Sequence, residues 1–493
     1  MESKINRITD ILRRDDGISG AMMYTEQISW ILFLKFMNDL ESEKAEDAVL
    51  DGKTYNFVLD EQYRWSHWAV VKVNGKKDVI NSKSGDDLLN FVNKELFPYL
   101  KSFKSITENP KSIKYKIGAI FEYLDNRIAN GHTLREVLDI IDEMDFHNQA
   151  DLFQLSMVYE KLLKDMGSDG GNSGEFYTPR PLIKVMTDVV NPKIGDKVYD
   201  PAAGSCGFLI EAYNHIRYID IETNQQRELS TEQLRFLNED TFFGNEKTPL
   251  SYVMGVMNMI LHGVESPNIA KTNTLTKDIR GFEEKDRFDV ILANPPFGGK
   301  EKEQIQQNFP IKSNATELLF LQHMMNSLKL GGKCGVVIPE GVLFQTNNAF
   351  QSVKKDLLER FNVHTILSLP SGVFLPYSGV KTNVLFFDRN GSTRDIFYYE
   401  VNPPYKLTKN KPIAYEHFQE FLAVWQERKI TENSWVVNVS DIKDFDISAK
   451  NPNRVETIEH KSPIELVENI KVNNQEINDL MDEIEVILIN GRD

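Results

Sequence analysis

Cysteine is almost absent from this chain, since only Cys206 and Cys334 occur among its 493 residues. Two cysteines cannot form a disulfide framework or a cysteine zinc site. No apolar run approaches the roughly 18 residues of a membrane-spanning helix, and the start, MESKINRITDILRRDD, lacks a signal peptide's apolar core. We therefore expect a cytoplasmic protein with no membrane contact, and we assign no metal site.

An excess of basic residues is also missing, because the formal net charge is −16. A protein that holds DNA on its own usually presents a basic face, so a tight, sequence-reading DNA binder is disfavoured. A local basic groove stays possible. The chain also lacks internal repeats, low-complexity segments and a G-x-x-x-x-G-K-[S/T] phosphate loop.

The length exceeds what one hydrophobic core serves, so two or three domains are expected. Residues 1–165 predict a helical domain, in which apolar positions recur at a spacing of three and four. The clearest example is the set Ile28, Ile31, Leu32, Lys35 and Phe36. This domain is either a plain helical bundle or one that also touches a partner or DNA.

Residues 166–440 follow a different pattern, in which short β-rich runs alternate with helical ones. Such alternation predicts an α/β domain with a Rossmann-like, doubly wound and mostly parallel sheet. The runs VHTILSLP (363–370) and TNVLFFDR (382–389) are joined by a short connection, and we expect them to form an antiparallel pair at the sheet edge.

Residues 441–493 turn polar and then predict a C-terminal helix with one apolar stripe. Its members are Ile477, Leu480, Met481, Ile484, Ile487 and Leu488. The stripe either packs against its own domain or docks on another subunit.

Ligands of open α/β sheets bind beyond the carboxyl ends of the strands, so the loops there are the candidate sites. After the first run comes PAAGSCGFL, in which Gly204 and Gly207 permit a tight turn before a helix. The spacing is not G-x-G-x-x-G, so it leaves open either an adenosine-bearing ligand other than a dinucleotide or an ordinary turn.

Two acidic residues follow later strands of the predicted sheet. Glu246 stands at the end of the second strand, where it either binds the two hydroxyls of a ribose or caps a helix. Asp278 stands where we expect the third strand to end, within reach of an adenine amino group.

The most informative motif is Asn294-Pro295-Pro296-Phe297, directly after the apolar run FDVILA. Both prolines fix φ, so the Asn294 carboxamide and the neighbouring carbonyls form a rigid array of acceptors. Acceptors that take both hydrogens of a flat amino group localise its lone pair and make the nitrogen nucleophilic. Phe297 can stack on the ring that carries this group, and an adenine must leave the duplex to reach such a site. The alternative is a Pro-Pro turn that only ends a strand.

These motifs together resemble one family, the DNA adenine-N6 methyltransferases that use S-adenosylmethionine, and within it the modification (M) subunits of type I restriction–modification systems. NPPF is similar to the family's target-amine motif, DPAAGSCGFL to its methionine-side loop, and GEFYTPRPLIKVM to the segment that covers the cofactor. DLFQLSMVYEKLLKDMG, LKLGGKCGVVIPEGVLF, LPSGVFLPYSGVKTNVLFF and FDISAKNPN extend the resemblance over most of residues 1–460.

The resemblance implies roles for particular residues. Asn294 to Phe297 would orient the target adenine, and Cys206 would be a small filler. Residues that would bind the cofactor are Glu175, Phe176, Tyr177, Thr178, Pro179, Arg180, Asp200, Gly204, Ser205, Cys206, Gly207, Glu246 and Asp278.

The resemblance also implies partners, namely double-stranded DNA with the target adenine flipped out, a separate specificity (S) subunit, a second M subunit and possibly a restriction (R) subunit. Without a phosphate loop, restriction and translocation are not the work of this chain. The sequence thus indicates a methyltransferase that acts on adenine N6 in DNA. Alternatives are a protein methyltransferase that acts on glutamine side chains, or a non-catalytic DNA-clamping subunit.

Overall fold

The structure, a computed structural model, describes residues 2–144, 146, 162 and 178–453, without 74–75, 79, 221–222, 224, 265 and 376–377. It also describes residues 471, 474, 477, 478 and 481. The chain divides into two units, residues 1–451 and 452–493. In the second unit Ile477 and Met481 of the predicted apolar stripe are exposed, and the stripe's other four members lie outside the described residues.

The N-terminal part is helical, as the sequence predicts, with one short hairpin of β1 (Lys72–Val73) and β2 (Lys76–Lys77). Its helices are α1 (Glu2–Leu12), α2 (Ala21–Leu50), α3 (Trp65–Trp68), α4 (Gly85–Phe91), α5 (Phe97–Ile106), α6 (Ile113–Phe121) and α7 (Gly131–Asp142). The predicted stripe of α2 is buried, and the buried Lys35 within it pairs with Asp39 one turn later. That pairing compensates the burial of a charge in the helical core.

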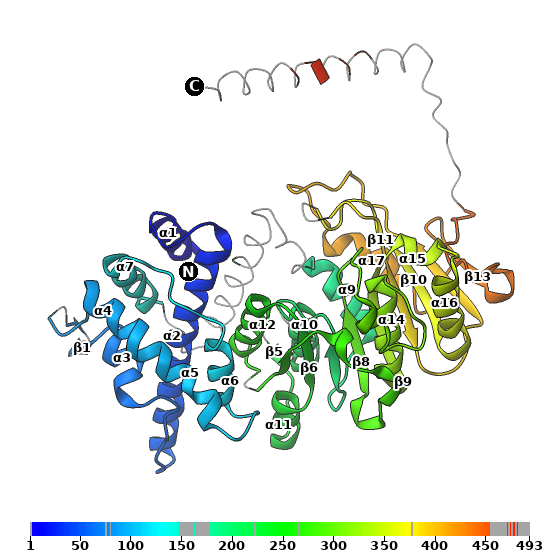
Figure 1. The fold of residues 1–493 in the computed structure, drawn as a ribbon. Coiled ribbons are helices and arrows are strands. Elements are labelled where there is room, and N and C mark those ends of the chain that lie inside the picture. The colour runs from blue at the N-terminus through cyan, green and yellow to red at the C-terminus, as the bar shows by residue number, and fades with distance from the viewer. Residues whose placement is uncertain are drawn as a thin grey trace. The chain divides into compact units, whose positions relative to one another are not determined.

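The second part is built on a nine-stranded sheet in the order β13-β12-β10-β11-β9-β8-β3-β6-β7 (Figure 1). The strands are β3 (Val198–Asp200), β6 (Phe242–Glu246), β7 (Asn268–Lys271), β8 (Phe288–Ala293), β9 (Leu328–Pro339), β10 (Asn362–Ser368), β11 (Thr382–Asp388), β12 (Asp395–Glu400) and β13 (Ser434–Asn438). β11 runs antiparallel to both of its neighbours, and β13 is antiparallel to β12. The other pairs are parallel, so the predicted fold class is confirmed.

Two details of the sheet differ from the expectation. β10 and β11 do pair antiparallel, but they do not form the edge, because β12 pairs with β10 on its outer side and β13 follows. The third strand, β7, ends at Lys271 and not near Asp278.

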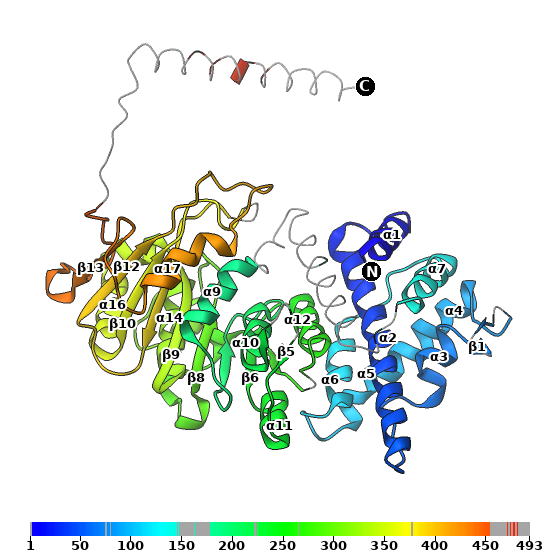
Figure 2. The same cartoon turned by 180° about the vertical axis from the view of Figure 1, so that it is seen from behind.

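Helices cover both faces of the sheet. On one face lie α9 (Arg180–Val190), α10 (Gly207–Arg217), α12 (Pro249–Leu261) and α17 (Gln419–Val424), which share a core with Val198 and Leu292. On the other face lie α14 (Thr316–Ser327) and α16 (Asn348–Arg360), packed on Tyr199 and Ile291. Figure 2, turned by 180°, brings α9 and α17 to the front. Neighbouring residues of one strand thus face opposite cores, as expected for a strand buried on both sides.

Shorter elements connect these layers. They are the hairpin of β4 (Tyr218–Asp220) and β5 (Gln225–Gln226), α11 (Thr231–Glu239), α13 (Glu303–Gln306) and α15 (Glu340–Phe344). α11 begins with a capping box between Ser230 and Gln233, which satisfies amide groups at its start.

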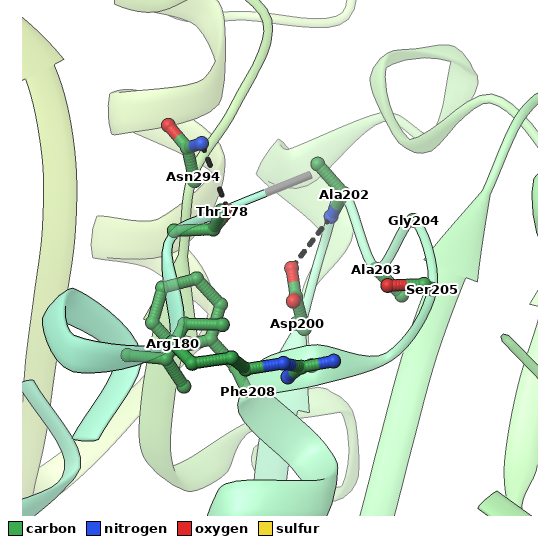
Figure 3. Close-up of a pocket in the computed structure, with 11 residues that line it drawn as sticks. Thr178, Arg180, Asp200, Ala202, Ala203, Gly204, Ser205, Phe208 and Asn294 are labelled. Atoms are coloured by element: carbon green, nitrogen blue, oxygen red, sulfur yellow. Dashed lines mark hydrogen bonds between the residues drawn. The ribbon is translucent and has the colours of Figure 1, made fainter. Parts of the chain in front are cut away.

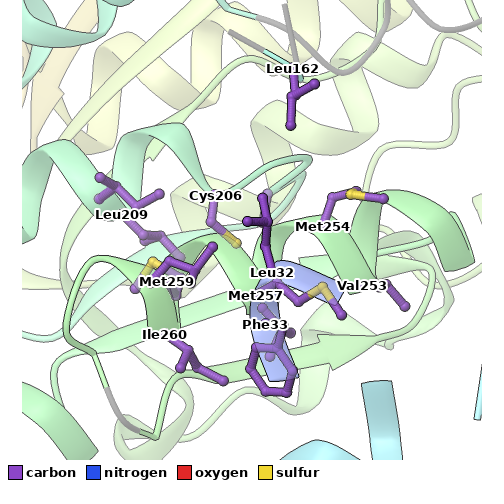
Figure 4. Packing of buried hydrophobic residues seen from close by; sticks show 14 of the residues in the cluster. Leu32, Phe33, Leu162, Cys206, Leu209, Val253, Met254, Met257, Met259 and Ile260 are labelled. Atoms are coloured by element: carbon purple, nitrogen blue, oxygen red, sulfur yellow. The ribbon is translucent and has the colours of Figure 1, made fainter. Parts of the chain in front are cut away.

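Helix α12 joins the helical part to the sheet. Its residues from Ser251 to Leu261 are all buried, and it contacts α2 and α6. The Ser29 hydroxyl of α2 donates to the Met254 sulfur at 3.4 Å, and Figure 4 shows Met254 and Met257 near Leu32 of α2. A helix that is apolar on every side must be covered on every side, and α12 is covered by both parts.

Candidate functional site

A pocket open to solvent lies where the strand order reverses between β3 and β8 (Figure 3). Such a reversal is where ligands of doubly wound sheets bind. The pocket is lined by Thr178, Arg180, Ile183, Asp200, Ala202, Ala203, Gly204, Ser205, Gly207, Phe208 and Asn294.

The loop between β3 and α10 forms one wall of this pocket. Gly204 (φ 49°) and Cys206 (φ 62°) both adopt the left-handed conformation, which is unusual for a residue with a side chain. The Cys206 amide donates to the Ala203 carbonyl at 2.6 Å, so the loop closes on itself just before α10 begins at Gly207. The free amide groups at the start of α10 therefore lie beside the pocket.

Helix α12 supports this loop from behind. A Cβ on Gly255 would lie 2.6 Å from the Gly204 carbonyl oxygen and 2.7 Å from the Cys206 sulfur, so only glycine fits there. The Asn258 side-chain amide, fully buried in α12, donates to the Ser205 carbonyl at 2.9 Å. Burial raises the pKa of the Cys206 thiol well above its usual range, which suits a small filler and not a reactive group.

Asp200 ends β3 and is only 1% exposed. Its carboxylate accepts from the Ala202 amide at 3.0 Å and otherwise faces the pocket. Burial raises the pKa of Asp200 to about 8, and the nearby charge of Glu246 adds to the effect. This carboxyl is therefore largely protonated at neutral pH, and a positively charged ligand would favour its ionised form.

Glu246 ends β6 and ties two segments together. One carboxylate oxygen accepts from the Gly204 amide at 2.9 Å, and the other accepts from the Thr248 amide at 2.7 Å. It does not line the pocket itself, although each oxygen keeps a further acceptor position. Glu246 thus holds the loop after β3 and the start of α12 in register.

Asn294 follows β8 and lines the pocket from the opposite side. Its side-chain nitrogen donates to the Thr178 hydroxyl at 3.0 Å (Figure 3). Its side-chain oxygen is buried, and among the described residues no donor reaches it. A buried acceptor without a donor is costly, so this oxygen is the polar group that a ligand is expected to satisfy.

The rest of the corner motif is less deeply placed. Pro295 is buried, Pro296 is exposed and Phe297 is half-buried. The Phe297 ring packs edge to face against Phe374, with 6.0 Å between the ring centroids. Part of the Phe297 ring therefore stays accessible beside Asn294, as a stacking role requires.

The pocket gathers a subset of the residues that the sequence singles out, namely Thr178, Arg180, Asp200, Gly204, Ser205, Gly207 and Asn294. Pro179, Cys206, Glu246 and Pro295 to Phe297 adjoin it without lining it. Asp278 lies seven residues beyond β7, is exposed, and pairs with Arg280 at 2.6 Å, which holds the pKa of its carboxyl at about 2. Glu175, Phe176 and Tyr177 lie outside the described residues.

Several residues of the site are absent from the prediction. Ile183, Ala202, Ala203 and Phe208 line the pocket, and Gly255 and Asn258 hold its loop. The one signal for Asn258 in the sequence is a lone amide within the apolar run YVMGVMNMIL. A buried amide of this kind usually has a specific partner.

Among the described residues, no group of three or more His, Cys, Asp or Glu side chains is arranged to hold a metal ion. Within the same residues no helix is both long enough and apolar enough to cross a membrane.

The fold and the pocket match a known class. Residues 149–462 match the N-6 DNA Methylase family, and residues 1–149 match the HsdM N-terminal domain. The chain is therefore a DNA methylase by family, and its pocket at the switch point is the place where such a fold binds ligands.

Relatives over the full length narrow this class. The methylase subunit of the type I restriction enzyme EcoEI from Escherichia coli is 35% identical over 99% of this chain and 97% of that protein. The EcoKI methylase subunit from Escherichia coli strain K12 is 30% identical over 92% of this chain and 81% of that protein.

Solved structures agree. A modification subunit of a putative type I restriction enzyme from Vibrio vulnificus superposes with a TM-score of 0.82 at 37% identity, covering 93% of this chain and 98% of that one. A second solved chain, described in terms of complex assembly and conformational transition of the type I restriction–modification system, superposes with a TM-score of 0.76 at 42% identity. The match covers 100% of this chain and 98% of that one. This chain belongs to the methylase subunits of type I restriction–modification systems, enzymes that methylate adenine in DNA at N6.

Family membership decides between the three activities that the sequence leaves open for this chain. The amine that receives the methyl group belongs to adenine and not to a glutamine side chain, and the chain is an enzyme and not a clamp.

Proposed function

We propose that this chain transfers the methyl group of S-adenosylmethionine to N6 of an adenine swung out of duplex DNA, while a separate specificity subunit selects the DNA site. The observation that carries the proposal is the buried Asn294 oxygen, which no donor among the described residues reaches, in the lining of the pocket at the switch point of the sheet. An adenine amino group would supply the missing hydrogen.

The target amine is prepared by acceptors of this chain. The Asn294 side-chain oxygen accepts a hydrogen bond from one N6 hydrogen, and a backbone carbonyl of the adjoining prolines accepts a hydrogen bond from the other. The N6 lone pair is thereby withdrawn from the adenine ring and directed away from it. Phe297 supports the adenine ring by stacking. The bound methyl donor would supply an electrophilic methyl group to the N6 lone pair, with the sulfur as leaving group, and N6 would lose one proton to solvent.

Residues of the pocket would hold the methyl donor. S-adenosylmethionine, when bound, supplies an electrophilic methyl group on a sulfonium. The start of α10 at Gly207 and the Arg180 guanidinium would receive the carboxylate of its methionine part, and Asp200 would face its positive charges. The remaining acceptor positions of Glu246 would take the ribose hydroxyls. Alignment of the methyl donor with the target amine in this way is proposed to supply most of the rate enhancement.

Thr178 is expected to set the orientation of the Asn294 amide. Thr178→Val removes the hydroxyl that accepts the hydrogen bond of the Asn294 side-chain nitrogen. The carboxamide can then rotate, and its oxygen faces the target amine in only a fraction of the molecules. We expect kcat to fall about tenfold, while Thr178→Ser keeps near-normal kcat because the hydroxyl is retained. Single-turnover methylation, measured together with cofactor affinity, tests this; an equal loss in both variants would contradict it.

Asp200 predicts a pH signature. Because its pKa is raised to about 8, binding of a cation should displace the proton, so cofactor affinity should rise with pH up to about pH 8. At pH 7 binding should release about one proton, and Asp200→Asn should abolish the release. Calorimetry in two buffers of different ionisation enthalpy measures the protons, and the same release from both proteins would contradict this role.

The same raised pKa affects folding. Between about pH 4 and pH 8 the native carboxyl keeps a proton that the unfolded chain has lost, so its contribution to stability falls as pH rises. The stability of Asp200→Asn relative to the wild-type protein should therefore increase over this range.

The partners belong to the same proposal. The relatives are named as methylase subunits of restriction enzymes, so we propose an assembly of this chain with a specificity subunit, a second copy of itself and, for restriction, an R subunit. The proposed domains are residues 1–165, 166–440 and 441–493. The apolar stripe of the predicted C-terminal helix is proposed to dock on another subunit of the assembly.

Co-expression with a specificity subunit of the same type I system tests the function directly. The purified assembly should transfer labelled methyl groups from S-adenosylmethionine to adenine N6 at one DNA sequence, and omission of the specificity subunit should remove the sequence preference. Label in protein or on another base would refute the proposal.

A further inference from the structure

One aromatic side chain near the target site is exposed. Phe344, the last residue of α15, has 51% of its surface accessible, whereas every other phenylalanine that the structure describes is buried or half-buried. A ring that is half exposed contributes less to the stability of the fold than a buried one, and its accessible surface is available for binding.

The backbone on both sides of Phe344 is held in place. The Lys354 ammonium, fully buried in α16, donates to the carbonyls of Leu343 at 2.7 Å and Gln345 at 2.8 Å. The Ile447 amide also donates to the Leu343 carbonyl. Burial lowers the pKa of Lys354 to about 8. Phe344 is thus an exposed ring on a rigid turn and not the tip of a loose loop.

Contacts connect this turn to the target corner. The Glu340 amide of α15 donates to the Lys381 carbonyl at 3.0 Å, and the Lys381 ammonium pairs with the Glu340 carboxylate at 2.6 Å. The connection between β10 and β11 that ends at Lys381 also carries Phe374, the residue against which Phe297 packs. β8, which precedes Phe297, and β9, which precedes Phe344, are parallel neighbours in the sheet. Phe344 and Phe297 therefore belong to adjoining loops at the same end of the sheet.

The charge around Phe344 suits an approach to DNA. Residues 341–353 contain no acidic side chain, in a chain whose net charge is −16. A segment without carboxylates can approach phosphates without the repulsion that most of this surface would exert.

We propose that Phe344 inserts into the duplex beside the target and stacks on a base there, filling the space that the adenine leaves when it swings out. Apolar side chains between base steps are a general way to stabilise opened DNA, and each base stacked on an aromatic ring gains binding energy. This inference rests on the proposed function, because it presupposes an adenine outside the duplex. Phe344 acts by positioning the DNA and takes no part in the chemical step.

The test compares paired and unpaired targets in the intact assembly with its specificity subunit. Phe344→Ala should lower kcat/KM for a fully paired duplex about tenfold to a hundredfold. With a mismatched base opposite the adenine the target is already loosened, and the variant should come within about threefold of wild type. Phe344→Trp keeps a stacking surface and should retain activity on both substrates.

The matched control is Leu330→Ala. Leu330 is also an exposed apolar residue, but it lies near the opposite end of the sheet, close to the start of β9, so its loss should leave both substrates unchanged. Fluorescence of 2-aminopurine at the target position reports the swung-out state, and Phe344→Ala should lower this signal.

Three results would overturn the inference. Unchanged kcat/KM on the paired duplex would show that Phe344 does not assist opening, and an equal loss on paired and mismatched DNA would place its role elsewhere. Loss of the specificity subunit from the Phe344→Ala assembly, seen by size-exclusion chromatography with light scattering, would make this surface a protein interface. If the wild-type assembly methylates no adenine, the proposed function itself fails, which separates the two outcomes.

Discussion

Asn294→Ala is expected to reduce methyl transfer by about a hundredfold to a thousandfold, the scale seen when one preorganised hydrogen-bonding group is lost from an active site. The substitution removes the buried oxygen that is left for the target amine, together with the hydrogen bond to Thr178. Cofactor affinity should stay within several-fold, because most of the pocket is lined by the loop after β3 and by α9 and α10. Single-turnover transfer to DNA and equilibrium binding of S-adenosylmethionine measure the two quantities separately.

Asn294→Asp is the matched control. It keeps an acceptor at the same position, and the Thr178 hydroxyl can donate to it, so much of the transfer rate should survive. Near-normal rates in Asn294→Ala would contradict the assigned role, and so would complete loss of cofactor binding in that variant.

Gly255→Ala should weaken cofactor binding more than tenfold without touching the cofactor. The added methyl group would lie 2.6 Å from the Gly204 carbonyl oxygen and 2.7 Å from the Cys206 sulfur, so the loop after β3 must move out of its position. Overpacking of this kind costs about 1–3 kcal/mol of folding stability, and a displaced loop no longer presents the start of α10. Binding calorimetry and thermal unfolding test both effects.

Gly281→Ala provides the comparison for this change. Gly281 also receives one methyl group, but no heavy atom lies within 4 Å of the new Cβ and its φ is not in the left-handed range. Both affinity and unfolding temperature should stay near the wild-type values. An equal response of the two variants would show that the contact between α12 and the loop does not matter.

The sequence predicts the centre of the sheet well, because β3, β6 and β8 are short buried runs followed by distinctive loops. It predicts an antiparallel edge but not the strands that form it. β12 is the run DIFYYE, which pairs in parallel with β10, and β13 lies some 34 residues further along the chain, so neither partner follows from local pattern. Pairings between distant segments depend on tertiary packing, which periodicity within one segment does not encode.

The residues of the site also divide into those that the sequence predicts and those that it does not. Asp200, Gly204, Gly207 and Asn294 are recognisable because each belongs to a motif next to a strand end. Gly255 and Asn258 are not, because α12 is apolar on all sides and its sequence alone does not show which face meets the loop. The sequence predicts Asp278 at the end of the third strand, but β7 ends seven residues earlier and the turn at Thr274–Thr276 follows it.

The most direct test of the central claim is an experimental structure of the assembly with S-adenosylhomocysteine and DNA that contains the target adenine. We predict that the Asn294 side-chain oxygen lies about 3 Å from adenine N6, while the Asn294 side-chain nitrogen still donates its hydrogen bond to the Thr178 hydroxyl. An adenine seated in the site with its amino group on other acceptors, and the Asn294 oxygen turned away from it, would contradict the account.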